Sequence, residues 1–131
     1  MNQSNPSARH NRSYAPEDLK VFKGPRDEYK PGSYWVVGDD YGYAELLFMR
    51  NSDAFHNKTL YIENIVVKEP DRGKGYGRKL YNKIECFADN LGLEYIQIDS
   101  ELDAVGFWKK LGFQEINKTY YKNKKAMIKE V

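Results

Sequence analysis

Three glycines at alternate positions, Gly73, Gly75 and Gly77, stand among basic residues in the stretch DRGKGYGRKL. An apolar run precedes them and an amphipathic pattern follows, so they lie between an expected strand and an expected helix. The first turn of a helix presents backbone N–H groups that lack intrahelical partners at the positive end of the helix dipole. Because glycine has no Cβ, the oxygens of a ligand can approach such a backbone closely. The pattern therefore predicts a phosphate-binding loop.

The spacing of the glycines decides which phosphate loop this is. A nucleotide P-loop needs GxxxxGK followed by Ser or Thr, whereas here Arg78 directly follows Gly77. A dinucleotide-binding loop needs GxGxxG, and this chain has GxGxG. Both kinds are excluded on spacing. The basic side chains around the loop favour a ligand with more than one negative charge, and these are Arg72, Lys74, Arg78 and Lys79.

A pattern that does fit is Arg-x-x-Gly-x-Gly, which runs from Arg72 to Gly77. It resembles the pyrophosphate loop of the GNAT superfamily, the acyl-CoA-dependent N-acetyltransferases. A second block, AVGFWKKLGF at residues 104–113, is similar to the motif B of that family. Either block alone is compatible with a tight turn or a helix stop, but both occur here in order and correctly separated. The resemblance covers residues 33–131 in the order of the elements.

The resemblance implies transfer of an acetyl group from acetyl-CoA to an amine, with no metal. It places the pantetheine arm beside the main chain of residues 63–67 and the diphosphate at the glycine loop. A backbone N–H near Ile65 or Val66 would hold the thioester oxyanion. The implied cofactor-binding residues are Ile65, Val66, Val67, Arg72, Gly73, Lys74, Gly75, Tyr76, Gly77, Arg78, Lys79 and Trp108.

Glu63 is the candidate general base. An alkyl amine with a pKa of ~10.4 is mostly protonated at neutral pH, so it needs a proton acceptor before it can attack. Glu63 is the only charged residue in LYIENIVV, and a carboxylate in an apolar strand is expected to be desolvated, with a raised pKa. Polyamine and aminosugar acetyltransferases of the family resemble this stretch, with Glu-Asp where this chain has Glu63-Asn64. The alternative is that Glu63 pairs with a lysine or faces solvent at a sheet edge.

The chain departs from the family pattern in motif B. Many members have a tyrosine there that protonates the leaving thiolate, where this chain has Trp108. An indole N–H is not an acid of useful strength, so Trp108 is expected to wall the thioester end or to pack in the core. A thiol with a pKa of ~8.5 can leave largely unassisted, or Tyr120 or Tyr121 can substitute. Glu101 replaces an asparagine that often contacts pantetheine, and that role is not carried over.

The acceptor is less well defined. The gap between Phe22 and Ser33 is too short for the usual two helices of the family, so the acceptor side is expected to be open. An open side suits an exposed lysine, a protein N-terminus or a polyamine-like amine. The acidic residues that could offer a negative rim to such an amine are Glu45, Asp99, Glu101 and Asp103.

Two other classes of function remain open. One is an acetyltransferase for an amino sugar or amino acid, with its pocket completed in a homodimer. The other is a domain that binds acyl-CoA without catalysis, or binds nucleic acid through the run KTYYKNKKAMIKEV. Such a run is more often the solvated face of an edge strand, where lysines discourage aggregation, so nucleic acid is not expected.

The elements that must position these residues follow from the patterns. Apolar residues at 80, 84, 87 and 91 predict an amphipathic helix ended by Gly92, and AVGFWKKLG predicts a second, shorter helix. Strands are predicted at 19–22, 60–67 and 94–99, in a hairpin over 33–50, and in two runs near the C-terminus. With the resemblance, this indicates an α/β (α+β) fold: a mixed, mostly antiparallel sheet of about six to seven strands flanked by helices, with the first helical segment reduced.

Length and composition set the outer bounds. The 131 residues suffice for one domain, expected at 19–131 after a flexible tail at 1–18 that is rich in Asn, Ser and Pro. The net charge of +2 gives no reason to expect a nucleic-acid or membrane partner. The single cysteine and the absence of a signal-peptide or membrane-span pattern predict a cytoplasmic protein.

Overall fold

The computed structural model describes residues 15–25, 32–49, 58–68, 73–117 and 121–131. Within these residues the chain forms a seven-stranded sheet in the order β1-β2-β3-β4-β5-β7-β6. Only β4 and β5 run parallel, and every other neighbouring pair is antiparallel. The elements are β1 (Lys20–Lys23), β2 (Tyr34–Gly38), β3 (Gly42–Phe48), β4 (Thr59–Val67), α2 (Tyr76–Asn90), β5 (Tyr95–Glu101), the 3-10 helix η2 (Leu102–Ala104), α3 (Val105–Lys110), β6 (Gln114–Glu115) and β7 (Lys124–Glu130). The predicted fold class is therefore confirmed.

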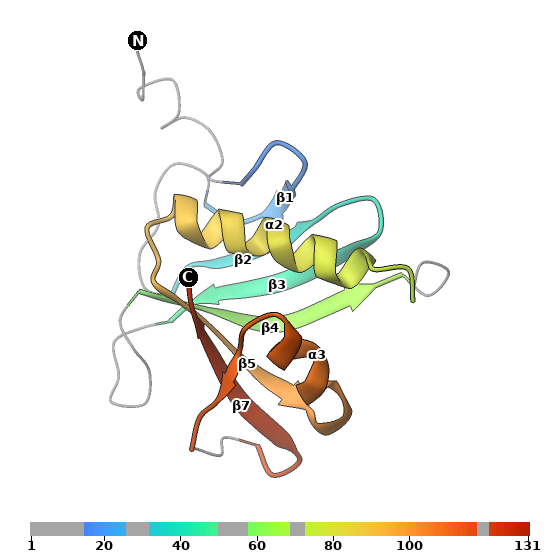
Figure 1. Cartoon of the computed structure of the whole chain (residues 1–131). Coiled ribbons are helices and arrows are strands. Elements are labelled where there is room, and N and C mark those ends of the chain that lie inside the picture. Colours follow the sequence, from blue (N-terminus) through green and yellow to red (C-terminus); the bar gives the residue numbers. More distant parts are fainter. Residues whose placement is uncertain (1–14, 26–31, 50–57, 69–72, 118–120) are drawn as a thin grey trace.

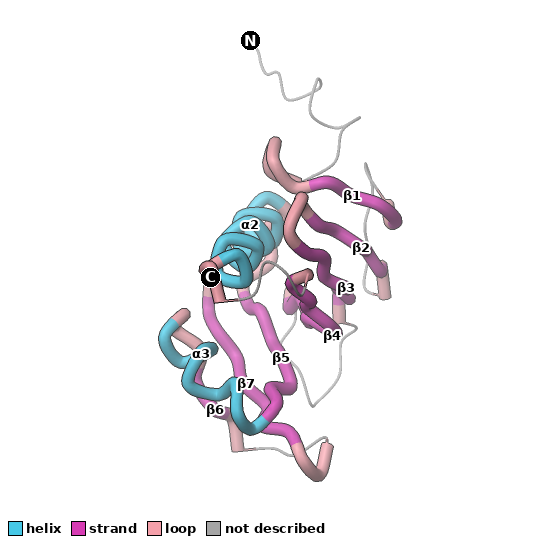
Figure 2. The backbone as a smooth tube through the Cα atoms, turned by 90° about the vertical axis from the view of Figure 1, so that its right-hand side faces the viewer, coloured by secondary structure: helices cyan, strands magenta, loops and turns pink. Residues whose placement is uncertain are grey.

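Helices α2 and α3 lie on the same face of the sheet (Figures 1 and 2). Helix α2 packs on the β2–β4 half, where the ring of Phe87 meets that of Trp35 edge-on at 5.3 Å. Beneath the helices a row of side chains crosses the sheet from Trp35 through Leu46 and Ile62 to Ile98, and none is more than 6 % exposed. In the described part of the chain no helix covers the opposite face. We call this helix-free side the open face, although Thr59 and Gln97 are buried on it.

Helix α2 follows the predicted apolar stripe. Leu80, Ile84, Phe87 and Leu91 are all buried, because their spacing places them on the side that faces the sheet. The helix stops where predicted, since Gly92 adopts a left-handed φ of 76° and its N–H donates to the carbonyl of Asp89.

The hairpin between β2 and β3 is also confirmed, and a single carboxylate organises its turn. Asp39 Oδ1 accepts hydrogen bonds from the backbone N–H groups of Tyr41 and Gly42. Asp39 Oδ2 accepts one from Lys83 Nζ of α2 at 2.8 Å. The turn is thereby tied to the helix that covers the hairpin.

The structure corrects two expectations at the ends of the chain. The C-terminal strand is not an edge strand, because β7 lies between β5 and β6, and the two-residue β6 forms the edge. The last part of the predicted tail is packed on the domain: Ala15 contacts the core and Asp18 lies 3.6 Å from Lys83. Residues 1–14 lie outside the described part. Among the described helices, none is long and apolar enough to cross a membrane.

Candidate active site

The central strands β4 and β5 separate halfway along their length. Their parallel pairing runs from Thr59 opposite Tyr95 to Ile62 opposite Ile98 and then ends. Beyond Ile62, β4 continues to Val67 paired with β3 alone, whereas β5 continues to Glu101 paired with β7 (Figure 1). A gap therefore opens in the middle of the sheet.

A β-bulge at Glu63 stands where the gap begins. Asn64 pairs with Glu45 and Ile62 pairs with Leu46, so Glu63 is an extra residue in β4. A bulge bends its strand and increases the local twist, which turns β4 away from β5. The expectation that Glu63 is desolvated is wrong, because the bulge leaves this residue exposed.

The main chain of β4 directs some of its polar groups toward the gap. The Lys68 N–H donates to the Tyr41 carbonyl at 2.8 Å, which fixes the direction of the backbone at this end of the strand. Since antiparallel pairing alternates, the N–H and C=O groups of Val66 point toward β3, and those of Ile65 and Val67 point toward the gap. Of the two residues expected to hold an oxyanion, Ile65 has the suitable direction and Val66 does not.

A pocket of about 300 Å³ occupies the gap. It brings together five of the residues expected to catalyse or to bind the cofactor, namely Glu63, Ile65, Val67, Gly77 and Trp108. The remaining lining residues are Ile62, Asn64, Ile98, Asp99, Ser100, Glu101, Ala104, Phe107 and Lys124. The pocket thus extends from the start of α2 to the point where β4 and β5 part.

The glycine loop meets this pocket at the N-terminus of α2. Gly73 and Gly75 have left-handed φ values of 80° and 82°, and Gly75 caps the helix without a side-chain hydrogen bond. The conformation of Gly77 is ordinary, but a Cβ there would lie 3.5 Å from Val67 and 3.9 Å from Phe107, two lining residues of the pocket. Gly73 and Gly75 therefore shape the turn, whereas Gly77 keeps the end of the pocket open.

The basic residues of the loop are not all directed to the pocket. Lys74 and Arg78 are exposed at the start of α2, and Arg72 lies outside the described residues. The side chain of Tyr76 stacks on Tyr41 at 3.7 Å, and Lys79 Nζ lies 5.4 Å from the centre of the Tyr76 ring. Tyr76 can therefore serve a ligand in the gap only through its backbone, and the backbone N–H of Lys79 already donates to the Gly75 carbonyl at 3.2 Å. Both side chains lie on the side of the β2–β3 turn.

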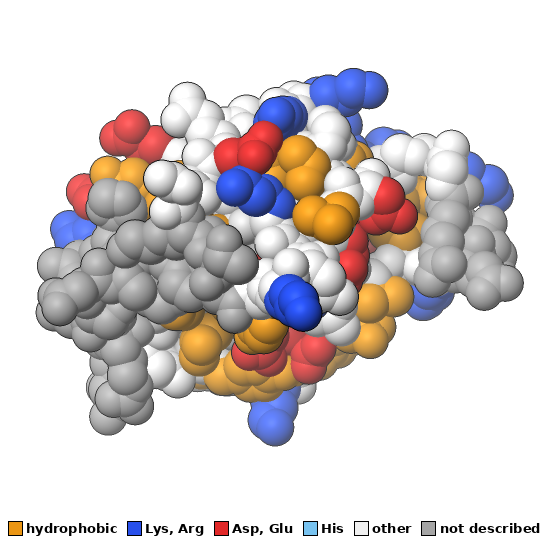
Figure 3. Space-filling model, turned by 90° about the horizontal axis from the view of Figure 1, so that it is seen from below, with side chains coloured by type: hydrophobic (Ala, Val, Ile, Leu, Met, Phe, Trp, Pro, Cys, Tyr) orange, Lys and Arg blue, Asp and Glu red, His pale blue; other side chains and the backbone are white. Residues whose placement is uncertain are grey.

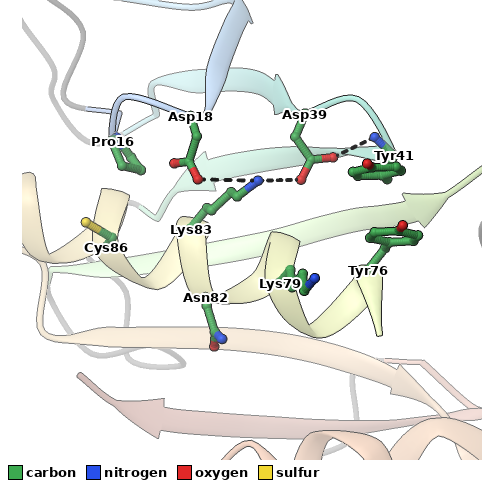
Figure 4. Close-up of a pocket in the computed structure, with 9 residues that line it drawn as sticks. All are labelled: Pro16, Asp18, Asp39, Tyr41, Tyr76, Lys79, Asn82, Lys83 and Cys86. Carbon is green, nitrogen blue, oxygen red and sulfur yellow. Dashed lines mark hydrogen bonds and ion pairs between the residues drawn. The ribbon is translucent and has the colours of Figure 1, made fainter. Parts of the chain in front are cut away.

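Those two side chains line a second pocket of about 640 Å³, between α2 and the β2–β3 turn (Figure 4). Its most buried cation, Lys83, is already paired with Asp39 at 2.8 Å and with Asp18 at 3.6 Å. The smaller pocket is the better candidate site despite its size, because it lies where β4 and β5 separate and it is lined by Gly77 in the first turn of α2.

Trp108 forms one wall of the candidate site and also belongs to the core. It is 4 % exposed, and its ring meets those of Tyr81 and Phe113 edge-on at 5.8 and 5.2 Å. The two tyrosines considered as thiolate proton donors remain unassigned: Tyr121 is exposed and Tyr120 lies outside the described residues.

Two acidic residues that the sequence indicated as a possible rim, Asp99 and Glu45, are each paired with a tyrosine that it did not indicate. Tyr61 Oη donates to Asp99 Oδ2 at 2.5 Å, and burial together with this carboxylate raises the pKa of Tyr61. Tyr34 Oη donates to Glu45 Oε2 at 2.6 Å, and this bond raises the pKa of Tyr34 to about 12. Both pairs join residues on different strands, so only the register of the sheet reveals them.

Comparison with known proteins agrees with this geometry. Residues 3–113 match the model of the acetyltransferase (GNAT) family. The chain is 32 % identical over 101 residues to an L-ornithine N5-acetyltransferase of Arabidopsis thaliana, covering 74 % of this chain and 43 % of that protein. It is 25 % identical to a spermine/spermidine N(1)-acetyltransferase of Bacillus subtilis, covering 79 % of this chain and 71 % of that protein. The chain thus spans less than half of the first of these relatives.

Solved structures support the same fold. The PaiA N-acetyltransferase of Thermoplasma acidophilum, solved in complex with coenzyme A, superposes with a TM-score of 0.59 at 15 % identity. The match covers 75 % of this chain and 60 % of that one. With the family match over most of its length, the chain belongs to the GNAT family of acetyltransferases.

Proposed function

We propose that this protein transfers an acetyl group from acetyl-CoA to a primary amine. The observation that carries the proposal is the gap between β4 and β5, which holds a pocket and leads to the glycine loop at the start of α2. The two relatives described above are named for acting on L-ornithine and on spermine and spermidine, all of them amines. A cytoplasmic location remains a prediction.

The residues present fit coenzyme A. The N–H and C=O groups of Ile65 are directed to bind an extended amide-containing arm as an added strand would. The uncapped N-terminus of α2, with Lys74 and Arg78 exposed beside it, suits a diphosphate. When bound, acetyl-CoA supplies the acetyl group as an activated thioester.

Glu63 is the proposed proton acceptor. A free alkyl amine with a pKa of ~10.4 must lose a proton before its lone pair can attack. Glu63 lines the pocket and is exposed, so its carboxylate can take that proton directly or through water and release it to solvent. Its role rests on position, since it is not buried as the sequence led us to expect.

The acceptor is proposed to be an exposed lysine, a protein N-terminus or a polyamine-like amine. The reason is the open face of the sheet: in the described part of the chain no helix stands between β1 and β2 to close it. A nucleic-acid partner is disfavoured, because basic and acidic side chains are interspersed on the face shown in Figure 3 rather than gathered into a continuous basic surface.

A release assay for the CoA thiol tests the proposal. The purified chain is incubated with acetyl-CoA and a panel of lysine peptides, polyamines, amino acids and amino sugars. Thiol release that depends on an amine, with a matching acetylated product, is expected. Binding of acetyl-CoA without turnover of any amine would instead identify a non-catalytic acyl-CoA-binding domain.

A further inference from the structure

Asp99 occupies the position in β5 where the gap begins. Ile98 forms the last parallel pair with Ile62, and Asp99 is the next residue along the strand. It lines the pocket together with Glu63 and Asn64 of β4. The carboxylate of Asp99 is therefore at the inner end of the candidate site.

One oxygen of the Asp99 carboxylate accepts a hydrogen bond and the other has no hydrogen-bond partner. Oδ2 accepts the hydrogen bond from Tyr61, whose raised pKa keeps the hydroxyl protonated as a donor. Oδ1 is buried and has no hydrogen-bond partner. Gln97 lies on the same face and its Nε2 is likewise buried without a partner, so the two side chains do not satisfy each other. A buried acceptor without a donor is costly, which points to a donor that arrives with a ligand.

The face on which Asp99 lies indicates how that ligand enters. Ile62 and Ile98 are buried beneath the helices, and side chains alternate along a strand, so Tyr61 and Asp99 point to the open face. On that face Tyr34 and Asn64 hold the carboxylate of Glu45 by hydrogen bonds of 2.6 and 3.2 Å. Ionised acidic side chains around an open approach favour a cationic ligand.

We propose that Asp99, oriented by Tyr61, binds the ammonium group of the acceptor through Oδ1 and thereby selects amines that are cationic at neutral pH. An N–H of the ammonium donates to Oδ1. When a proton passes from the nitrogen to Glu63, the neutral amine keeps an N–H for Asp99 and its lone pair becomes free to attack. This inference rests on the proposed acetyltransferase function.

The test compares steady-state kinetics of Asp99→Asn with the wild type for two acceptors, an alkyl diamine and an arylamine that is uncharged at neutral pH. The KM for the diamine is expected to rise roughly 10- to 100-fold, because a charge-assisted hydrogen bond is lost. The KM for the arylamine and the affinity for CoA, measured by calorimetry, are expected to change less than about threefold. Asp89→Asn, which changes an exposed acid of α2 outside both pockets, is the matched control and should leave all three values unchanged.

The variant Tyr61→Phe provides an independent reading if Asp99→Asn does not fold. This substitution keeps the Asp99 carboxylate but removes the hydrogen bond that orients it. The KM for the diamine should therefore rise several-fold, while the affinity for CoA is unchanged. Two results, obtained with an active wild type, would overturn the role of Asp99 and leave the acetyltransferase proposal standing. In the first, the folded variant has an unchanged KM for the diamine. In the second, its KM rises equally for the diamine and the arylamine. A wild type that binds CoA but acetylates no amine would overturn both.

Discussion

At the scale of single residues, the glycine loop was the most predictable part of the site and the carboxylates were the least. The loop follows from local rules, because a left-handed φ and a missing Cβ are properties of one position. The burial of Glu63 was predicted wrongly, since the apolar neighbours in LYIENIVV do not reveal the bulge that exposes it. The Tyr61–Asp99 pair joins residues 38 positions apart and depends on strand register.

The two kinds of glycine predict opposite effects of the same substitution. Gly77→Ala should leave stability unchanged or raise it by up to about 1 kcal/mol, since alanine is the better helix former and its Cβ makes only ordinary contacts. The same methyl group stands at the end of the pocket, so the Kd for CoA should rise roughly tenfold. Gly75→Ala should instead cost about 1–2 kcal/mol of stability because of its φ of 82°.

Thermal melts and calorimetric titrations of both variants check this contrast. If Gly77→Ala bound CoA as well as the wild type, Gly77 would not border the cofactor site.

Replacement of Glu63 tests the proton acceptor. In Glu63→Gln the kcat for an alkyl amine should fall at least about 100-fold, because the amide cannot accept the proton. The rise of the rate with pH that reports an ionising base should disappear, while CoA affinity stays constant. Glu94→Gln, an exposed glutamate at the far end of β5, serves as the control. An unchanged pH–rate profile in Glu63→Gln would remove Glu63 from the mechanism.

At the scale of elements, periodicity predicted both helices and most strands, because apolar spacing and glycine stops are local signals. The order in which the strands pair in the sheet was harder to predict from the sequence. The C-terminal strand was expected at an edge, but β7 inserts between β5 and β6. The separation of β4 from β5, on which the candidate site depends, results from the bulge and from the separate partners of the two strands, so no short stretch of sequence encodes it.

The Asp39–Lys83 ion pair should contribute to stability as a tie between the hairpin and α2. Burial alone would raise the pKa of Asp39, but hydrogen bonds from Lys83 and from the turn backbone hold it below its usual value. The side chain is 6 % exposed, so Asp39→Ala should lower the free energy of unfolding by about 2 kcal/mol. Asp40→Ala, which removes an ion pair between exposed side chains in the same turn, should change it by less than about 0.5 kcal/mol.

The same pair predicts the sign of the pH dependence. Because the pKa of the Asp39 carboxyl is lower in the folded than in the unfolded state, its ionised form stabilises the fold. This stabilisation is fully present above the unfolded-state pKa of ~3.9 and is lost as the pH falls through the folded-state pKa. Denaturant unfolding should therefore show the effect of Asp39→Ala at neutral pH and a smaller effect in acid. The stabilising role of the Asp39–Lys83 pair would be contradicted if Asp39→Ala lowered the free energy of unfolding equally at both pH values. It would also be contradicted if Asp39→Ala and Asp40→Ala had equal effects.

At the scale of the whole molecule, the fold has two unlike faces. The helices cover one face and bring the N-terminus of α2 to the gap, while no helix of the described part of the chain covers the other face. We infer that the cofactor reaches the gap from the α2 end and the amine from the open face. The shortness of the segment between β1 and β2 predicts an open acceptor side, but residues 26–31 of that segment lie outside the described residues. Glu45 and Asp99 were expected at an acidic rim from the sequence, and the assembled sheet reveals their pairing with Tyr34 and Tyr61.

Amide chemical-shift mapping of the labelled protein during a titration with CoA tests the central claim most directly. The account predicts that the largest shifts occur at Ile65, Gly75 and Gly77, where β4 and the start of α2 border the gap. Saturation without shifts at these three amides, or with the largest shifts around Asp39 and Lys83 in the other pocket, would contradict it.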